Sequence, residues 1–172
     1  MKHKSWWVFL VTVVLALVIY AFPVEGFVDE LLGRQNLRGI QGVAVVIGEL
    51  PPDFKKYGLT ESQLQVDIEL KLRMAGIKVL TGKKAIDQPF VYVQVEGGKK
   101  PNSYDLYLYH IGVELHQGVY LMRNKSIFSV VPTWSTGSFG EVSSQQFTFI
   151  RDRVKDFVDQ FINDYLSVNQ KQ

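Results

Sequence analysis

The sequence contains no cysteine among its 172 residues. This absence excludes disulfide frameworks, thiolate zinc sites, iron–sulfur clusters, thiol nucleophiles and acylation of a lipoprotein cysteine within this sequence. The net charge is only +2, which provides no electrostatic reason to expect nucleic acid as a partner. Glycine shows no period and no segment repeats, so collagen-like and solenoid proteins are excluded. What remains is a chain with 47% hydrophobic residues, which is enough apolar surface to exclude intrinsic disorder.

The amino-terminal region holds the longest apolar run. Residues 5–24 are 20 uncharged positions, preceded by Lys2 and Lys4 and followed by Glu25. As a helix this run would be about 30 Å long, enough to cross the hydrocarbon core of a membrane. Because the positive charges precede the run, we expect the rest of the chain on the outer side, which in a bacterium is the periplasm.

Two interpretations of this segment stay open. Pro23 would break a helix, and cleavage after Gly26 would release a domain that begins at Phe27. Against cleavage, the run is longer than a usual signal core, and Trp6 and Trp7 lie where aromatic residues anchor a retained helix at the interface. The protein is therefore expected to be exported, either free in the periplasm or anchored in the inner membrane with its carboxyl-terminal domain in the periplasm.

The composition divides the chain into four parts. We expect a signal peptide or signal anchor at 1–26, a connector at 27–41, a single domain at 42–168 and a short tail at 169–172.

The predicted domain is α+β, with a mostly antiparallel sheet of about five strands and two helices packed on one face. Capping boxes at Thr60 and Ser143 mark the starts of the helices, and Gly76 marks the end of the first. Period-two patterns predict strands at 77–80, 90–96, 104–123 and 127–135, and the run at 42–49, which is apolar on both faces, predicts a central strand.

Three details of the sheet follow from glycine and proline. The long strand at 104–123 should bend or bulge near Gly112 or Gly118. Pro132 should lie at an edge or a bulge because it has no N–H to donate to a neighbouring strand. The run Thr136–Gly140 is expected to be a loop.

Four stretches of the chain resemble a known group of proteins. They are residues 64–79 (LQVDIELKLRMAGIKV), 113–119 (VELHQGV), 133–135 (TWS) and 161–166 (FINDYL). These stretches are similar to small exported bacterial proteins of unknown function. The order of the elements also resembles the amino-terminal α/β domain of the translocation protein TolB. The resemblance carries no catalytic motif, and an analogy of fold does not transfer function.

The polar residues of the long strand could suggest a metal site. His110, Glu114 and His116 share one strand face, but residues four and six apart on a flat strand diverge too far to converge on one ion. A solvent-facing polar stripe explains the three residues without a ligand. We therefore expect no metal, no cofactor and no catalytic residue, and we predict that the protein is not an enzyme.

The outward face of the predicted sheet is more informative. If alternate residues such as Val93 and Ile111 face the helices, several apolar side chains face away from them: Tyr92, Leu106, Leu108, Tyr120 and Met122. A lone domain seldom leaves this much apolar area exposed, which predicts an interaction surface. The alternative, that the connector or a loop covers these residues, stays open.

The sequence therefore predicts a non-catalytic accessory or protein-interaction module of the cell envelope. Its expected partner is an envelope protein or a second copy, with the membrane contacted through residues 5–24 if they are retained, and no nucleic acid. The alternative is a small-ligand binding protein for an apolar or sugar-like molecule, in which Tyr92, Tyr107, Tyr109 and Trp134 would supply stacking surfaces.

Overall fold

The computed structural model describes residues 33–81 and 88–169. The apolar segment 5–24 and the proposed cleavage positions lie outside these ranges. The described residues belong to one compact unit that begins at Gly33. Within the two described ranges, no helix is both long and apolar enough to cross a membrane.

A four-stranded sheet with the order β1-β2-β3-β4 forms the centre of this unit. The strands are β1 (Ala44–Ile47), β2 (Phe90–Lys99), β3 (Leu106–Leu121) and β4 (Asn124–Ser143). Strand β3 is antiparallel to both β2 and β4, whereas β1 is parallel to β2. The α+β class is confirmed. The sheet is mostly antiparallel, as expected, but it has four strands instead of about five, and the strand predicted to be central is the edge strand β1.

The parallel pair has a topological cause. Between β1 and β2 the chain passes through α3 (Pro52–Lys56) and α4 (Glu61–Met74), and such a crossover returns it to the end of the sheet from which β1 started. The strand expected at 77–80 contributes only a single parallel bridge, from Val79 to Val43. It lies beside the start of β1 instead of forming a fifth strand.

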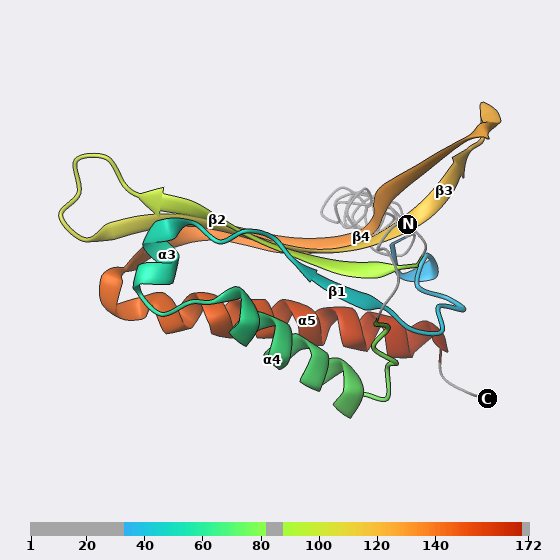
Figure 1. Cartoon of the computed structure of the whole chain (residues 1–172), viewed down its shortest axis with the longest axis horizontal. Coiled ribbons are helices and arrows are strands. Elements are labelled where there is room, and N and C mark those ends of the chain that lie inside the picture. Colours follow the sequence, from blue (N-terminus) through green and yellow to red (C-terminus); the bar gives the residue numbers. More distant parts are fainter. Residues whose placement is uncertain (1–32, 82–87, 170–172) are drawn as a thin grey trace, which may run out of the picture. The chain divides into compact units, whose positions relative to one another are not determined.

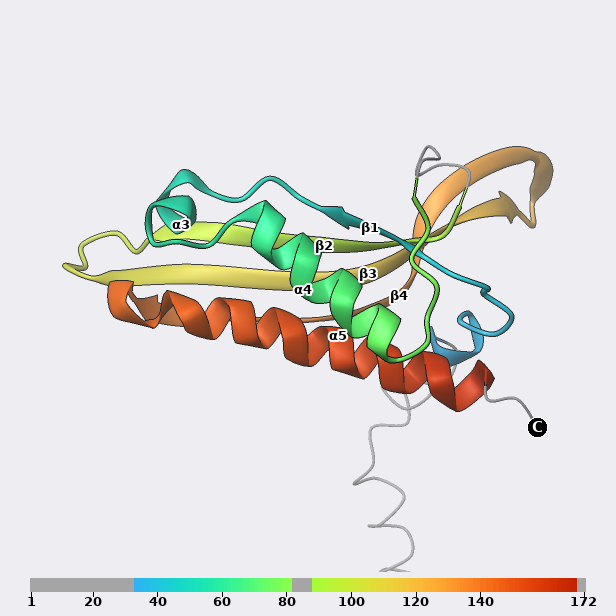
Figure 2. The same cartoon turned by 60° about the horizontal axis from the view of Figure 1, so that its bottom comes forward.

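The helices cover one face of the sheet (Figures 1 and 2). Besides α3 and α4 they comprise the short 3₁₀ turn η2 (Ser144–Gln146) and the long α5 (Phe147–Asn169). The predicted start and end of α4 are confirmed. The Gln63 N–H donates to Thr60 Oγ1 at 3.3 Å, Gly76 has a φ of +76°, and the Ile77 N–H donates to the Leu72 carbonyl at 2.9 Å. The capping box of Ser143 also forms, at the start of η2.

The core lies between this sheet face and the helices. Every second residue of β2 and β3 enters it, so Val93, Ile111 and Val113 are fully buried. Phe161 of α5 is also fully buried. Leu37, from the segment that the sequence analysis assigns to the connector, has no exposed surface and packs into the same core.

The predicted loop at Thr136–Gly140 is wrong, because β4 continues through it to Ser143. The glycines there have a packing role. A Cβ on Gly137 would lie 2.4 Å from the Ile111 carbonyl oxygen, and one on Gly140 would lie 2.6 Å from Tyr109 Oη. Both glycines therefore allow atoms of β3 to lie close to the backbone of β4, and neither marks a turn.

The predicted irregularity in β3 lies a few residues from its expected position. The register of β3 and β4 shifts between Leu115 and His116, where Thr133 is an extra residue in β4. Pro132 pairs with His116 directly after this bulge, on an edge strand, as predicted.

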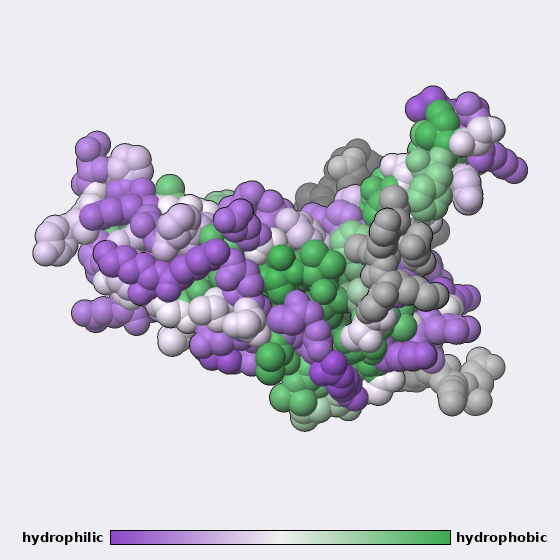
Figure 3. Space-filling model, viewed as in Figure 1, coloured by the Kyte–Doolittle hydropathy of each residue, from purple (hydrophilic) through white to green (hydrophobic). Residues whose placement is uncertain are grey.

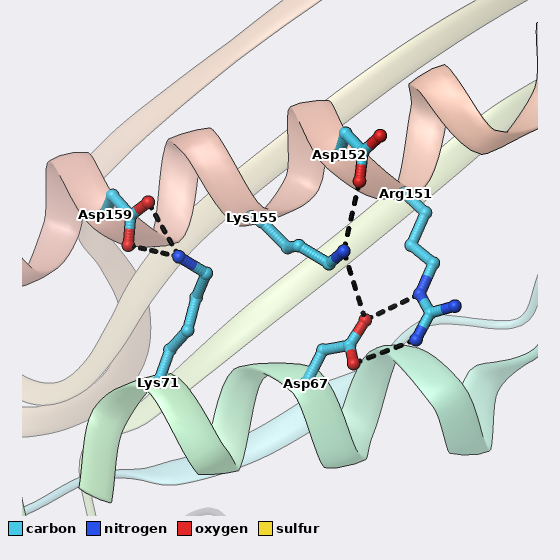
Figure 4. A network of polar contacts seen from close by, with 6 residues as sticks. All are labelled: Asp67, Lys71, Arg151, Asp152, Lys155 and Asp159. Atoms are coloured by element: carbon cyan, nitrogen blue, oxygen red, sulfur yellow. Dashed lines mark hydrogen bonds and ion pairs between the residues drawn. The ribbon is translucent and has the colours of Figure 1, made fainter. Parts of the chain in front are cut away.

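Charged side chains join α4 to α5 (Figure 4). Arg151 donates two hydrogen bonds to Asp67, from Nε at 2.6 Å and from one terminal nitrogen at 2.9 Å. Lys71 binds Asp159 at 2.6 Å, and Lys155 lies 4.0 Å from Asp67. The hydrogen bond from Arg151 lowers the pKa of the Asp67 carboxyl group. These pairs align the two helices over the sheet.

A second polar cluster fixes the start of the described chain to the end of α5. The buried Asp164 carboxylate accepts a hydrogen bond from Trp134 Nε1 at 2.9 Å and pairs with Arg34 at 2.8 Å. Tyr165 Oη donates to the Ile40 carbonyl at 2.5 Å, and Asn169 Nδ2 donates to the Leu37 carbonyl at 2.9 Å. Because these contacts surround Leu37, they hold residues 33–40 against the domain.

Candidate interaction surface

The sheet face opposite α4 and α5, which we call the open face, has no helix against it among the described residues (Figure 2). On β2 and β3 the side chains alternate between the core and this face: Val91 and Leu115 are buried, whereas Glu96 and His110 are exposed. The antiparallel register places outward residues of neighbouring strands directly opposite each other.

The five residues predicted to form one surface lie on the open face or at the turn beyond it, but in three separate places. Leu106 and Leu108 lie near one end of the sheet and are 37% and 43% exposed. Tyr92 is half-buried in the middle, and its hydroxyl lies close to Gly48 after β1. Tyr120 and Met122 lie at the far end of the β3–β4 pair. Whether they bind a partner stays a prediction.

The end of the sheet with Leu106 and Leu108 gains a third apolar residue that the sequence analysis missed. Phe139 pairs with His110 and is 86% exposed. The sequence analysis expects a loop at this residue, whereas the register puts Phe139 in β4, diagonal to Leu108. The alternation of β4 on both sides of Trp134 is the sequence signal that could have revealed it. We call Leu106, Leu108 and Phe139 the apolar end.

The middle of the open face holds a compact polar and aromatic cluster. His116 stacks on Phe90, with ring centroids 5.0 Å apart, and lies edge-on to Tyr92 at 5.7 Å. His116 Nε2 is also 2.7 Å from a Glu114 carboxylate oxygen. These side chains cover one another, so the middle of the face exposes less apolar surface than either end.

The predicted polar stripe of His110, Glu114 and His116 forms two separate pairs on the open face. His110 lies beside Glu96, 4.0 Å away, and His116 beside Glu114. Within the described ranges, no three or more histidine, aspartate or glutamate side chains are grouped so that they could hold a metal ion.

The rings proposed for ligand stacking lie on opposite faces of the sheet. Tyr107, Tyr109 and Trp134 are at most 8% exposed and belong to the core, whereas Tyr92 is on the open face. A hydrogen bond with Tyr57, at 2.8 Å between the hydroxyl oxygens, raises the pKa of Tyr107 to about 12. The four rings therefore do not line a common cavity, and ligand binding stays a prediction that this placement does not favour.

One more apolar surface lies on the helical side of the unit. Val66, Leu70 and Met74 of α4 are spaced by four residues and are all more than half exposed. Helical spacing alone could have found this stripe, because residues four apart share a helix face.

No protein-family model matches the chain, and no curated protein matches it. The structure is similar to a crystal structure of the rare lipoprotein B from Shewanella oneidensis, with a TM-score of 0.36 and 11% sequence identity. This similarity covers 72% of the present chain and 94% of that chain. A likeness at this level gives no argument about function, and the resemblance to TolB stays a prediction.

Proposed function

We propose that this protein is a non-catalytic accessory module of the cell envelope that binds another protein through the open face of its sheet. Export or tethering by residues 1–26 would place the domain outside the cytoplasm. Support for that location comes from the uncharged run at 5–24 with lysines before it.

The observation that carries the proposal is the apolar end of the open face. Leu106, Leu108 and Phe139 lie on two paired strands, and Phe139 is 86% exposed although its strand is anchored in the core at Trp134 and Val142. Aromatic and aliphatic side chains held by a regular sheet lose little conformational entropy on binding, which suits them to a protein interface.

Polar residues border this apolar end. Glu141, directly opposite Leu108, pairs with Lys100 at 2.7 Å, and His110, directly opposite Phe139, lies 4.0 Å from Glu96. An apolar centre with a charged rim is the usual anatomy of a protein–protein interface. Gly112 and Gly137 pair directly across the strands next to it, and Gly137 is exposed while Gly112 is buried, so a partner could approach the backbone at Gly137.

The test is photocrosslinking in the cells that make the protein. A photoreactive phenylalanine analogue at Phe139 should give a discrete adduct heavier than the monomer. The matched control carries the analogue at Met74, which is 79% exposed on α4. Monomer alone at Phe139, or the same adduct at both positions, would contradict the proposed docking face.

A further inference from the structure

The β3–β4 pair extends beyond the rest of the sheet. The pairing of β2 with β3 ends at Phe90 and His116, after which β3 and β4 continue as an isolated two-stranded ribbon (Figure 1). We call this ribbon, residues 116–132, the arm. Its tip is a turn at Met122 and Arg123.

The tip of the arm combines exposed apolar side chains with positive charge. Tyr120 is 66% exposed and Met122 is 96% exposed, and Ile127 and Phe128 are 38% and 45% exposed. Figure 3 shows apolar and hydrophilic residues side by side at the end of the arm. The tip therefore presents apolar surface that no other described element covers.

All charge at the tip has one sign. Arg123 and Lys125 are both exposed, and the sequence has no aspartate or glutamate between Glu114 and Glu141. Elsewhere in the unit several cations pair with carboxylates, as Lys100 does with Glu141 and Lys55 with Glu61. The apolar side chains of the tip match the hydrocarbon interior of a lipid bilayer, and its cations match anionic lipid head groups.

The root of the arm is fixed. Thr133, the extra residue of the bulge, accepts a hydrogen bond from Asn36 Nδ2 at its carbonyl (2.7 Å) and one from Gln117 Nε2 at its hydroxyl (2.7 Å). Gln117 also donates to the Asn36 carbonyl at 3.1 Å. These contacts tie the bulge at the root of the arm to Asn36 of the body.

Chain length sets an upper limit on the distance between this root and the end of the apolar segment. Residues 25–35 separate position 24 from Asn36, and even fully extended they span at most roughly 40 Å. The arm from Gln117 to Met122 adds about 20 Å of reach. If residues 5–24 are retained in a membrane, the tip is within reach of its surface.

We propose that the tip of the arm binds the surface of an anionic phospholipid bilayer, with Met122, Tyr120 and Phe128 entering the interfacial region and Arg123 and Lys125 contacting lipid phosphates. The aromatic rings suit the interface, where one end of a side chain is apolar and the other is hydrated. This inference depends on the proposed function in one respect only, which is that an envelope location brings the arm near a membrane.

Because the sequence has no cysteine, a single introduced cysteine can be labelled at a chosen position. A single Met122→Cys substitution in the full chain takes an environment-sensitive fluorophore, and the labelled protein is reconstituted in vesicles of phosphatidylcholine with or without phosphatidylglycerol. We expect at least a twofold rise in emission with a blue shift in the anionic vesicles. The matched control is Tyr104→Cys, labelled at a 97% exposed residue between β2 and β3.

A charge-reversed version of the labelled protein, with Arg123→Glu and Lys125→Glu, should lose the enhancement while its circular dichroism spectrum stays unchanged. The proposal is overturned if labels at positions 122 and 104 respond equally or if charge reversal has no effect. It is also overturned if emission at position 122 rises with protein concentration without lipid, which would identify a second copy as the occupant. Crosslinking at Phe139 does not depend on these results, so failure of the proposed function would be seen separately.

Discussion

The two halves of the β3–β4 pair have the same pattern of alternating apolar residues but different surroundings. Between Tyr107 and Leu115, every second side chain lies under the helices, and Ile111 has no exposed surface. Among residues 33–81 and 88–169 no helix packs on the arm, and Tyr120 is 66% exposed. Apolar alternation therefore builds a core only where a second layer covers it, and elsewhere it builds a surface.

This difference predicts separate roles for the half of the pair under the helices, which we call the body half, and for the arm. The body half joins α5 to the sheet and should carry most of the stability, whereas the arm should contribute little to stability. Substitutions in each half can sharpen that comparison or break it.

The largest effect is expected in the body. Phe161→Ala removes a fully buried ring that lies edge-on to Trp134, with centroids 5.2 Å apart. We expect a loss of about 3–5 kcal/mol in the free energy of unfolding, measured on the full chain by urea denaturation and far-ultraviolet circular dichroism. Phe149→Ala, on the same helix but 44% exposed, is the control. Equal losses for the two variants would show that burial under the sheet does not determine stability.

An intermediate effect is expected at the contact between α4 and α5. Asp67→Asn removes the negative charge and one of the two carboxylate oxygens that accept from Arg151, and it should cost about 1 kcal/mol near neutral pH, since Arg151 is partly exposed. Unfolding curves of the variant and the wild type measure this difference. Asp156→Asn, at a more exposed pair on α5, should change stability much less.

The pH dependence of the Asp67 effect has a defined sign. Because the hydrogen bond from Arg151 lowers the pKa of Asp67 in the folded state, the stabilisation is complete above the ordinary value of 3.8. It is lost as the pH falls from 3.8 through the lower pKa of the folded protein. The gap between wild type and Asp67→Asn should therefore shrink below this value, and a gap of constant size in acid would refute the assigned role of the ion pair.

The smallest effect is expected in the arm. Tyr120 and Phe128 pair edge to face, with centroids 5.5 Å apart, and both are largely exposed. The double variant Tyr120→Ser, Phe128→Ser should change the free energy of unfolding by less than about 1 kcal/mol in the same urea assay. A loss as large as that of Phe161→Ala would make the arm part of the cooperative core and end the distinction between the two halves.

Local signals in the sequence predicted α4, α5 and the inward side of the sheet, whereas the short α3 was not predicted. The Thr60 capping box and the left-handed Gly76 depend on a few neighbouring residues, so their sequence signature is nearly complete. The alternation of Val91 and Val93 has the same local character. Alternation also placed Tyr107 and Tyr109 on the side of Ile111, where the structure buries all three.

Errors arose where a residue's role depends on a distant partner. Gly137 and Gly140 indicated a loop, because glycine is common in turns, but each leaves room for an atom of β3 that a sequence does not place. As a result Phe139 was missed, and the predicted surface lacked its most exposed aromatic residue on the body of the sheet. The parallel β1–β2 pair was missed for a related reason, since nothing near β1 specifies its partner.

The sequence by itself determined the class of the domain, the ends of α4, the bulge position of Pro132 and the set of apolar side chains on each side of the central strands, because these depend on period and on local backbone chemistry. Tertiary structure decided which of those side chains are core and which are surface. That choice depends on where α4 and α5 end over the sheet and where β2 stops pairing with β3, and these limits arise from contacts between residues far apart in the chain.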